Sequence, residues 1–308
     1  MNRGCGAIAL AGDVVGRCKL FQALAGTGTR QSETSARVPV ADATLEALAV
    51  KAETRRKFPA SLEVKLTQEL KGERSAGRAW VMVFSAEEGM GGYRKFVDEI
   101  SDLDGELLSS RLRKVSGKTR SELEEVLRCI EKRELKVVES EISKYTVDLI
   151  STRPWLVVEN FHTPICESEI SSYFRSTGST AYMGMNAEME CELQEISDDN
   201  FRQEYLASLG FKISMLPSLV QRLPGLLGQG VFYTVGDVET RAWLYPKTAK
   251  ISEASAAIHS DFAKKFLHAD VVKVAEYLKL GKKAKTSQKG REYDLEDACD
   301  IVDFKLKK

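Results

Sequence analysis

The chain has 308 residues, more than one hydrophobic core usually supports, so we expect about two domains. Hydrophobic residues make up 43% and charged residues 29%, an ordinary globular composition that excludes wholesale disorder. Lysine plus arginine and aspartate plus glutamate both number 45, so the formal net charge is zero. Because proteins that coat nucleic acid usually carry a basic excess, any nucleic-acid contact is expected in a local patch.

Several common types of site are missing from the sequence. The six cysteines form no C-x-x-C pair and there are only three histidines, so we predict no metal site. The apolar runs are strand-sized and the first residues do not resemble a secretory signal, so we predict no membrane contact. Dilute cysteines favour a reducing compartment. We therefore expect an intracellular, cytoplasmic location, with a mitochondrial or cytoskeletal assembly left open.

The N-terminal part has the pattern of an α/β nucleotide-binding fold. An apolar run at residues 7–11 ends at Gly12, and residues 19–24 then show helical spacing. This order predicts a strand, a glycine-containing turn and a helix. A second helix is predicted near residues 45–50, and further strands at residues 62–66 and 80–84.

The middle of the chain has a different spacing of apolar residues. Apolar residues recur every three to five positions over residues 96–112 and again over residues 123–137, with a glycine at 117 between them. This pattern predicts two amphipathic helices in an antiparallel hairpin. Because residues 154–158 have the character of a buried strand, the hairpin is expected as an insertion into one α/β domain.

The last region, from about residue 228, is predicted as a small mixed β/α domain. Strands are expected at residues 231–235, 240–245 and 300–306. One amphipathic helix is expected at residues 258–266, with alternatives around residues 271–280.

Residues 11–18 stand where a phosphate-binding loop would lie. Such a loop has the sequence G-x-x-x-x-G-K-[ST], whose backbone N–H groups surround phosphates while its lysine and hydroxyl contact the phosphate and Mg²⁺. Here the residues are A-G-D-V-V-G-R-C. Asp13 repels a polyanion, Arg17 is a poor substitute for a lysine point charge, and Cys18 is not a hard oxygen ligand. The alternative is a plain strand–turn–helix with two useful glycines.

The C-terminal third carries the most specific pattern. Residues 258–262 are I-H-S-D-F, residues 266–271 are F-L-H-A-D-V, and G-R-E-Y closes the pattern at residues 290–293. In order and spacing these segments resemble the TGS domain of the YchF/Obg-like ATPases. Upstream, residues 154–160 resemble the base-reading strand of that family, and residues 195–199 resemble its acidic linker.

The resemblance implies an α/β fold in three parts. These are a P-loop-type (OBG-type) G domain, an inserted antiparallel helical hairpin and a C-terminal β-grasp (TGS) domain. The expected bounds are residues 1–87 and 146–225 for the degenerate G domain, 88–145 for the hairpin and 226–308 for the TGS-like domain.

The other nucleotide motifs of the family are altered together with the loop. No D-x-x-G stands near residues 66–69, where the family has its Mg²⁺-side motif, and the segments that would act as switches are short. The family reads adenine with N-x-x-E; Asn160 is present here, but Thr163 occupies the glutamate position. Loss of the need to hydrolyse nucleotide would explain all these changes at once.

Two main hypotheses follow. The first is a catalytically degenerate YchF-like pseudo-NTPase (a pseudo-GTPase) that acts as an interaction component of a larger assembly, with no catalytic residue and no required cofactor. The alternative is a slow NTPase that binds ATP or GTP with Mg²⁺ and uses Arg17 in place of the lysine. Binding of nucleotide without turnover is a third possibility. Any nucleotide contact would come from Gly12, Gly16, Arg17, Cys18 and Asn160.

The family binds ribosomes, so the resemblance implies a ribosomal or other RNA-containing partner, contacted through the TGS-like domain. This domain contains a basic run without intervening acid: Lys279, Lys282, Lys283, Lys285, Lys289 and Arg291. Such a run can contact phosphates without reading sequence. The alternative is a solvated loop. The helical hairpin is a second candidate surface, for a protein partner.

Overall fold

The structure is a computed structural model. It describes residues 7–26, 33–40, 42–67, 79–114, 118–131, 149–150, 153–164, 168–177, 179, 181–290 and 293–307. Within these ranges, no helix is both long enough and apolar enough to cross a membrane.

The chain forms two compact units. The first contains Met1–Ile8, Ser35–Val64 and Leu216–Lys308, and the second contains Ala9–Thr34 and Lys65–Met215. Residues 35–64 group with the C-terminal part because the strand β3 (Arg56–Phe58) pairs in parallel with the strand β9 (Glu239–Pro246). The domain bounds predicted from the sequence divide the chain differently and stay a prediction.

Up to residue 160, the second unit has the order of elements that the sequence predicts. Its elements, the first of which begins in the other unit, are β1 Ala7–Gly12, α1 Val14–Ala25, β5 Ala79–Ser85, α3 Gly89–Leu112, α4 Lys118–Glu131, β6 Trp155–Asn160, α6 Glu169–Ser176, β7 Tyr182–Met185, α7 Ala187–Leu193 and α8 Asp199–Ser208. Strands β1, β5, β6 and β7 are neighbours in this order. Strand β5 pairs in parallel with β6, and β6 pairs in parallel with β7.

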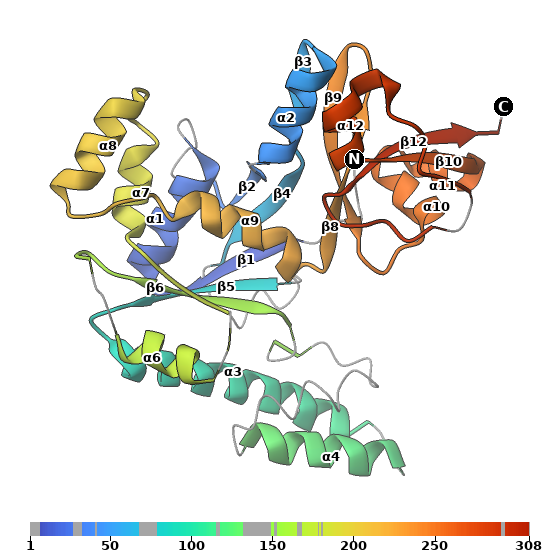
Figure 1. Ribbon diagram of the computed structural model, residues 1–308. Coiled ribbons are helices and arrows are strands. Elements are labelled where there is room, and N and C mark those ends of the chain that lie inside the picture. The colour runs from blue at the N-terminus through green and yellow to red at the C-terminus, as the bar shows by residue number, and fades with distance from the viewer. Residues whose placement is uncertain are drawn as a thin grey trace. The chain divides into compact units, whose positions relative to one another are not determined.

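Both faces of this sheet are covered. Helices α1 and α7 pack on one face, and α3 and α6 on the other (Figure 1). Six consecutive residues of β5, 79–84, are therefore buried, which is why that segment is a continuous apolar run instead of an alternating one. The parallel arrangement gathers the carboxyl ends of the strands along one edge of the sheet.

The predicted helical hairpin is present as α3 and α4. The two helices share a cluster of buried leucine and valine side chains: Leu108, Leu112, Leu123, Val126 and Leu149. The N-terminal half of α3 packs on the sheet instead, through Phe96 and Ile100. Only the second half of α3 therefore serves as a hairpin arm. The remaining predicted hairpin residues, 132–145, lie outside the described residues.

The first unit is built on a mixed sheet with the strand order β11-β10-β12-β8-β9-β3. Its elements are β2 Ser35–Pro39, α2 Ala43–Ala52, β3 Arg56–Phe58, β4 Ser61–Leu66 (which ends in the second unit), α9 Leu216–Leu226, β8 Gln229–Val235, β9 Glu239–Pro246, α10 Ile251–Ala254, η1 Ser255–Ala257, α11 Ser260–Lys265, β10 Phe266–Lys273, α12 Val274–Leu280, η2 Gly281–Lys283, β11 Gln288–Gly290 and β12 Asp300–Leu306. Strands β10, β12, β8 and β9 enclose a core with Phe232, Tyr245, Ala269 and Val271.

The helix predicted at residues 258–266 is present over residues 260–265 only. The structure has only a six-residue helix, α11, which buries no side chain, and the strand β10 begins at Phe266. In β10 the side chains of Ala269 and Val271 are buried, while those of His268 and Asp270, which alternate with them, are partly exposed. This period of two was not predicted, because Phe266 also continues the helical spacing of α11. The predicted alternative is partly confirmed, since α12 covers residues 274–280.

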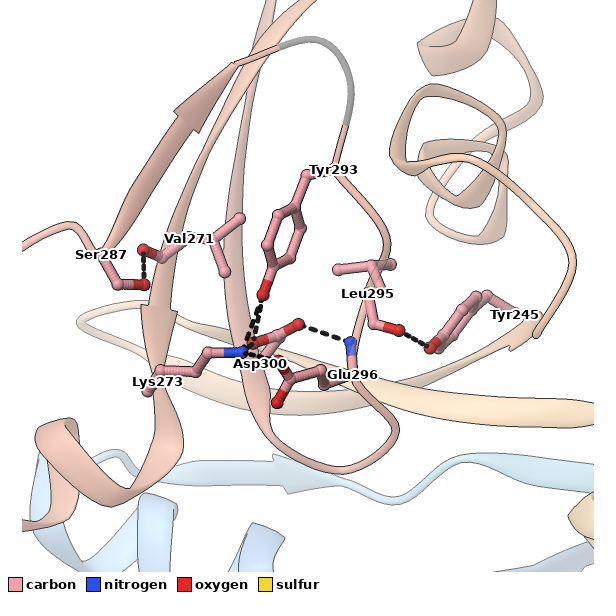
Figure 2. A network of polar contacts seen from close by, with 8 residues as sticks. All are labelled: Tyr245, Val271, Lys273, Ser287, Tyr293, Leu295, Glu296 and Asp300. Atoms are coloured by element: carbon pink, nitrogen blue, oxygen red, sulfur yellow. Dashed lines mark hydrogen bonds and ion pairs between the residues drawn. The ribbon is translucent and has the colours of Figure 1, made fainter.

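An ion pair between half-buried Lys273 and buried Asp300 ties β10 to β12 (Figure 2). It also holds the segment that joins β11 to β12. The Nζ atom of Lys273 lies 2.8 Å from Asp300 Oδ1, 3.0 Å from Glu296 Oε1 and 2.7 Å from the hydroxyl of Tyr293. Asp300 is fully buried, and its Oδ2 accepts the backbone N–H of Glu296 at 2.7 Å. Burial opposes the charge of Lys273, but the hydrogen bonds to Asp300 and Tyr293 outweigh it and raise the pKa of Lys273. The network fixes the chain entering β12.

We expect Asp300→Ala to lower the free energy of unfolding by about 2–4 kcal/mol, because it removes the buried carboxylate that pairs with Lys273 and accepts the N–H of Glu296. Urea denaturation measures this loss. Lys282→Ala, which removes an exposed ion pair with Asp237, is the control and is expected to leave the midpoint unchanged. Equal midpoints for Asp300→Ala and the unsubstituted protein would show that the network does not stabilise the domain.

Candidate functional site

The candidate nucleotide site lies at the carboxyl ends of β1, β5 and β6. There β1 ends at Gly12, β5 at Ser85 and β6 at Asn160. The N–H of Asp13 donates to Val83 O at 2.8 Å, and the N–H of Ala86 donates to Asn160 O at 2.8 Å. These bonds hold the three strand ends together. Ligands of open α/β sheets bind along this kind of edge.

No phosphate loop is formed at this edge. The helix α1 begins at Val14, so a single residue, Asp13, separates it from β1. The carboxylate of Asp13 accepts the N–H of Gly16 at 2.6 Å, and the carbonyl of Asp13 accepts the N–H of Arg17 at 3.0 Å. Asp13 is therefore the N-cap of α1. Its negative charge lies at the positive end of the helix, where a phosphate would otherwise bind.

The two glycines of the predicted motif are required by packing. Gly12 has a φ of +100°, and a Cβ there would lie 2.0 Å from Val83 O. A Cβ on Gly16 would lie 2.9 Å from Val83 Cγ1 and 3.0 Å from both Asn160 Nδ2 and Asp13 Oδ2. Close approach of α1 to β5 and β6 thus accounts for both glycines without a ligand.

Arg17 and Cys18 lie within the first turns of α1. The Nη1 group of Arg17 donates back to the carbonyl of Gly12 at 3.2 Å. Cys18 is half-buried. The exposed part of this first helical turn is apolar, since the side chains of Val14 and Val15 are 61% and 64% exposed.

Asn160, which stands where the family's adenine-reading motif begins, also has a structural role. Asn160 is 5% exposed, and its Oδ1 accepts the N–H of Ala187 at the start of α7 at 2.9 Å. Thr163 is exposed. The structure therefore brings Gly12, Gly16 and Asn160 together, but in a packed contact between β6, α1 and α7.

A bound nucleotide with Mg²⁺ does not fit these residues. Asp13 occupies the helix N-terminus, Cys18 supplies no hard oxygen ligand, and the exposed turn is apolar. Over the described residues, no three His, Cys, Asp or Glu side chains come close enough to hold a metal ion. The position of the D-x-x-G motif, beyond residue 67, lies outside the described residues.

The candidate lysines of the C-terminal region are all exposed. Lys279 lies in the last turn of α12, Lys282 and Lys283 form part of η2, and Lys289 is in β11. Two of them form ion pairs with acidic residues that are distant in sequence: Lys282 lies 2.6 Å from Asp237, and Lys289 lies 3.7 Å from Asp270.

The two remaining residues of the predicted basic run are Lys285 and Arg291. Lys285 follows η2 and is exposed, whereas Arg291 lies outside the described residues. The lysine run is therefore a surface feature over its described length, as the sequence predicts.

The capping role of Asp13 was not predicted from the sequence, although its signal was present. An Asp directly before an apolar helical pattern is a common N-cap. The same residues also fit the position of a phosphate loop, in which the charge of Asp13 is unfavourable, so the loop pattern hides the cap.

The C-terminal region resembles known families by sequence. Residues 230–307 match the C-terminal domain family of YchF GTPases, which is described as a protein of unknown function. The chain is 33% identical over 126 residues to the "Ribosome-binding ATPase YchF" of Bacillus subtilis, covering 39% of this chain and 34% of the relative. It is 36% identical over 124 residues to the human "Obg-like ATPase 1", covering 38% and 31%. The matched part spans about a third of each relative.

The fold resembles that of a solved YchF protein over nearly the whole chain. The YchF GTPase of Schizosaccharomyces pombe superposes with a TM-score of 0.81 and 19% identity, covering 97% of both chains. The predicted resemblance to the YchF/Obg-like family is confirmed. The predicted fold class, a G domain with an inserted helical hairpin and a C-terminal TGS domain, is confirmed as well.

We expect Gly16→Ala to destabilise the protein by about 1–3 kcal/mol, because the new methyl group would overpack against Val83 and Asn160. The matched control is Gly91→Ala, which changes the third residue of α3, where a Cβ meets nothing within 4 Å. There the substitution is expected to stabilise by about 0.5–1 kcal/mol, the usual gain of alanine over glycine in a helix. Thermal unfolding of both variants measures whether the two substitutions change stability in opposite directions. A stabilised Gly16→Ala protein would contradict the packing account.

Proposed function

We propose that this protein is a YchF-like pseudo-NTPase. It acts as a structural and interaction component of a ribosomal or other RNA-containing assembly, and it neither requires nor hydrolyses a nucleotide. Its location on this proposal is the cytoplasm. The TGS-like region carries the contact to the assembly.

The hydrogen bond between Gly16 N–H and the Asp13 carboxylate carries this proposal. A phosphate-binding helix N-terminus works because its N–H groups are available to an anion. In this chain an internal carboxylate already accepts one of them, and the chain supplies no loop with further N–H groups. A phosphate would have to displace Asp13 and then lie beside its charge, which is repulsive at close range.

Support for the partner comes from the relatives and from the charge distribution. Two bacterial relatives, from Bacillus subtilis and Buchnera aphidicola, are named ribosome-binding, and this chain is 33% and 31% identical to them over 126 residues. The lysines at 279, 282, 283, 285 and 289 are exposed in the C-terminal region. Lysine side chains neutralise RNA phosphates without reading base sequence.

Ribosome co-sedimentation tests the assembly. We expect the triple charge reversal Lys282→Glu, Lys283→Glu and Lys285→Glu to reduce the bound fraction several-fold at low salt, since removing each lysine–phosphate pair weakens binding and its salt dependence. The control is Lys264→Glu, Lys265→Glu and Lys307→Glu, the same charge change at other exposed lysines of this unit. Equal reduction in both triples, or no binding by the unsubstituted protein, would contradict the assigned contact.

A turnover assay separates this function from the slow NTPase. Release of phosphate from ATP or GTP, with and without Mg²⁺, is expected at the rate of the buffer. Mg²⁺-dependent turnover that disappears in Arg17→Ala would establish the alternative, in which Arg17 replaces the lysine of the phosphate loop.

A further inference from the structure

The helix α8 of the second unit buries little of its surface. Its one buried side chain is Leu206, which packs with Met189 and Leu193 of α7. Two other apolar side chains are exposed: Phe201 at 66%, and Leu209, which directly follows the helix, at 39%. In Figure 1, α8 lies at the outer edge of its unit. Packing on α7 therefore explains Leu206 but neither Phe201 nor Leu209.

The exposed apolar residues lie on one line along the helix. Phe201, Tyr205 and Leu209 are four residues apart, so their side chains follow one another on the same face. Tyr205 is half-buried, and its hydroxyl donates to the carboxylate of Glu192 in α7. The face of α8 thus continues onto α7 as one surface with an apolar centre.

The chain that leaves α8 is held in place by its own contacts. The ring of Phe211 stacks on that of Phe161, with the ring centres 6.1 Å apart. The buried carboxylate of Glu190 accepts the N–H of Met215 at 2.6 Å and the hydroxyl of Ser214 at 2.5 Å. A surface fixed in this way loses little conformational entropy when a partner binds to it.

Acidic residues surround the apolar centre. Residues 187–210 contain seven acidic residues and a single basic one, Arg202, although the whole chain has a net charge of zero. Arg202 pairs with Asp199 at 3.2 Å, and Lys19 of α1 pairs with Glu188 at 3.2 Å. In the part of the chain that the structure describes, no cation pairs with the four exposed carboxylates of Glu192, Glu195, Asp198 and Glu204.

Three of these four carboxylates lie next to the apolar line. Asp198 accepts the N–H of Phe201 at 3.0 Å, Glu204 follows Phe201 by three residues on the helix, and Glu192 binds the hydroxyl of Tyr205. An apolar centre with an acidic border is complementary to a polypeptide of the opposite charge.

We propose that this face of α8 is a docking site for a basic segment of a partner protein, with apolar side chains between its lysines and arginines. The unpaired carboxylates determine the class of partner, because they repel the phosphates of RNA and the headgroups of an anionic membrane. The inference goes beyond the proposed function, since it assigns a protein contact to the other compact unit.

The alternative is a solvated acidic surface without a partner. Such a surface would attract a basic peptide through charge alone, whether or not the peptide has apolar residues. A docking face depends in addition on its apolar centre, which is desolvated when the partner binds. Basic peptides with and without apolar side chains therefore distinguish the two.

The test is fluorescence anisotropy of the full chain with a labelled amphipathic peptide of Lys and Leu. We expect Phe201→Ala and Leu209→Ala together to weaken binding about ten-fold or more, because apolar anchors carry most of the energy of such an interface. The control is Val14→Ala with Val15→Ala, which removes two other exposed apolar side chains of the same unit. This control is expected to bind as the unsubstituted protein does.

A second pair of substitutions tests the charges. We expect Glu192→Gln with Glu204→Gln to weaken binding several-fold at low salt and to reduce its salt dependence. The amide oxygen at position 192 still accepts the hydroxyl of Tyr205, so the surface keeps its shape. Glu87→Gln with Glu99→Gln changes two exposed glutamates in α3 and the turn before it, and is expected to leave binding unchanged.

Four results would overturn the inference. The first is no binding of the Lys and Leu peptide by the unsubstituted protein. The second is equally tight binding of a peptide of Lys and Ser, which would leave a solvated acidic surface. The third is an equal loss of binding in the control variants, and the fourth is a loss in only one of the two test pairs, since the proposed face needs both its apolar centre and its charges. Circular dichroism of every variant excludes unfolding as the cause.

Discussion

One short hydrogen bond, from the N–H of Gly16 to the carboxylate of Asp13, determines what the edge of the nucleotide-binding sheet can do. It caps α1 immediately after β1, so the chain has no residues left to form a phosphate loop. The early start of α1 brings Gly16 against Val83 and Asn160, which explains why a glycine remains there. The same constraint directs Arg17 back to the carbonyl of Gly12.

On the proposed function, this arrangement explains how a nucleotide-binding fold can persist without its ligand. In an NTPase the orphan N–H groups at the start of a helix depend on bound phosphate for a partner. Here the chain provides that partner itself, through a side chain that costs no binding entropy. Asn160 is used in the same way, since its amide holds the start of α7. Residues at the positions of the family's nucleotide motifs are thus part of the packing of β1, β6, α1 and α7.

The sequence predicts the parts of the fold whose signals are periodic. The buried run in β5, the helical spacing of α1 and the hairpin all follow from side-chain patterns that burial enforces. Strand β10 was missed because its first residue, Phe266, also continues a helical pattern. Strand β3 has three residues and no apolar alternation, so only its pairing with β9 defines it. Both strands were missed because tertiary contacts define them and the local sequence pattern does not.

The two candidate sites differ in the same respect. The loss of the phosphate loop was predictable from Asp13, Arg17 and Cys18, because the chemistry of single residues decides it. The position of Lys51 beside the C-terminal lysines was not, since Lys51 and Lys279 are brought together only by the contact of α2 with α12.

Calorimetric titration with ATP and with GTP, each with and without Mg²⁺, tests the central claim that Asp13 takes the place of a nucleotide phosphate. The ribosome-binding ATPase of Bacillus subtilis, titrated in parallel, serves as the positive control. The account predicts no binding heat for this protein with either nucleotide at concentrations that saturate the control. Binding with a micromolar Kd, about 8 kcal/mol, that requires Mg²⁺ would contradict it, because a phosphate would then have displaced the carboxylate from α1.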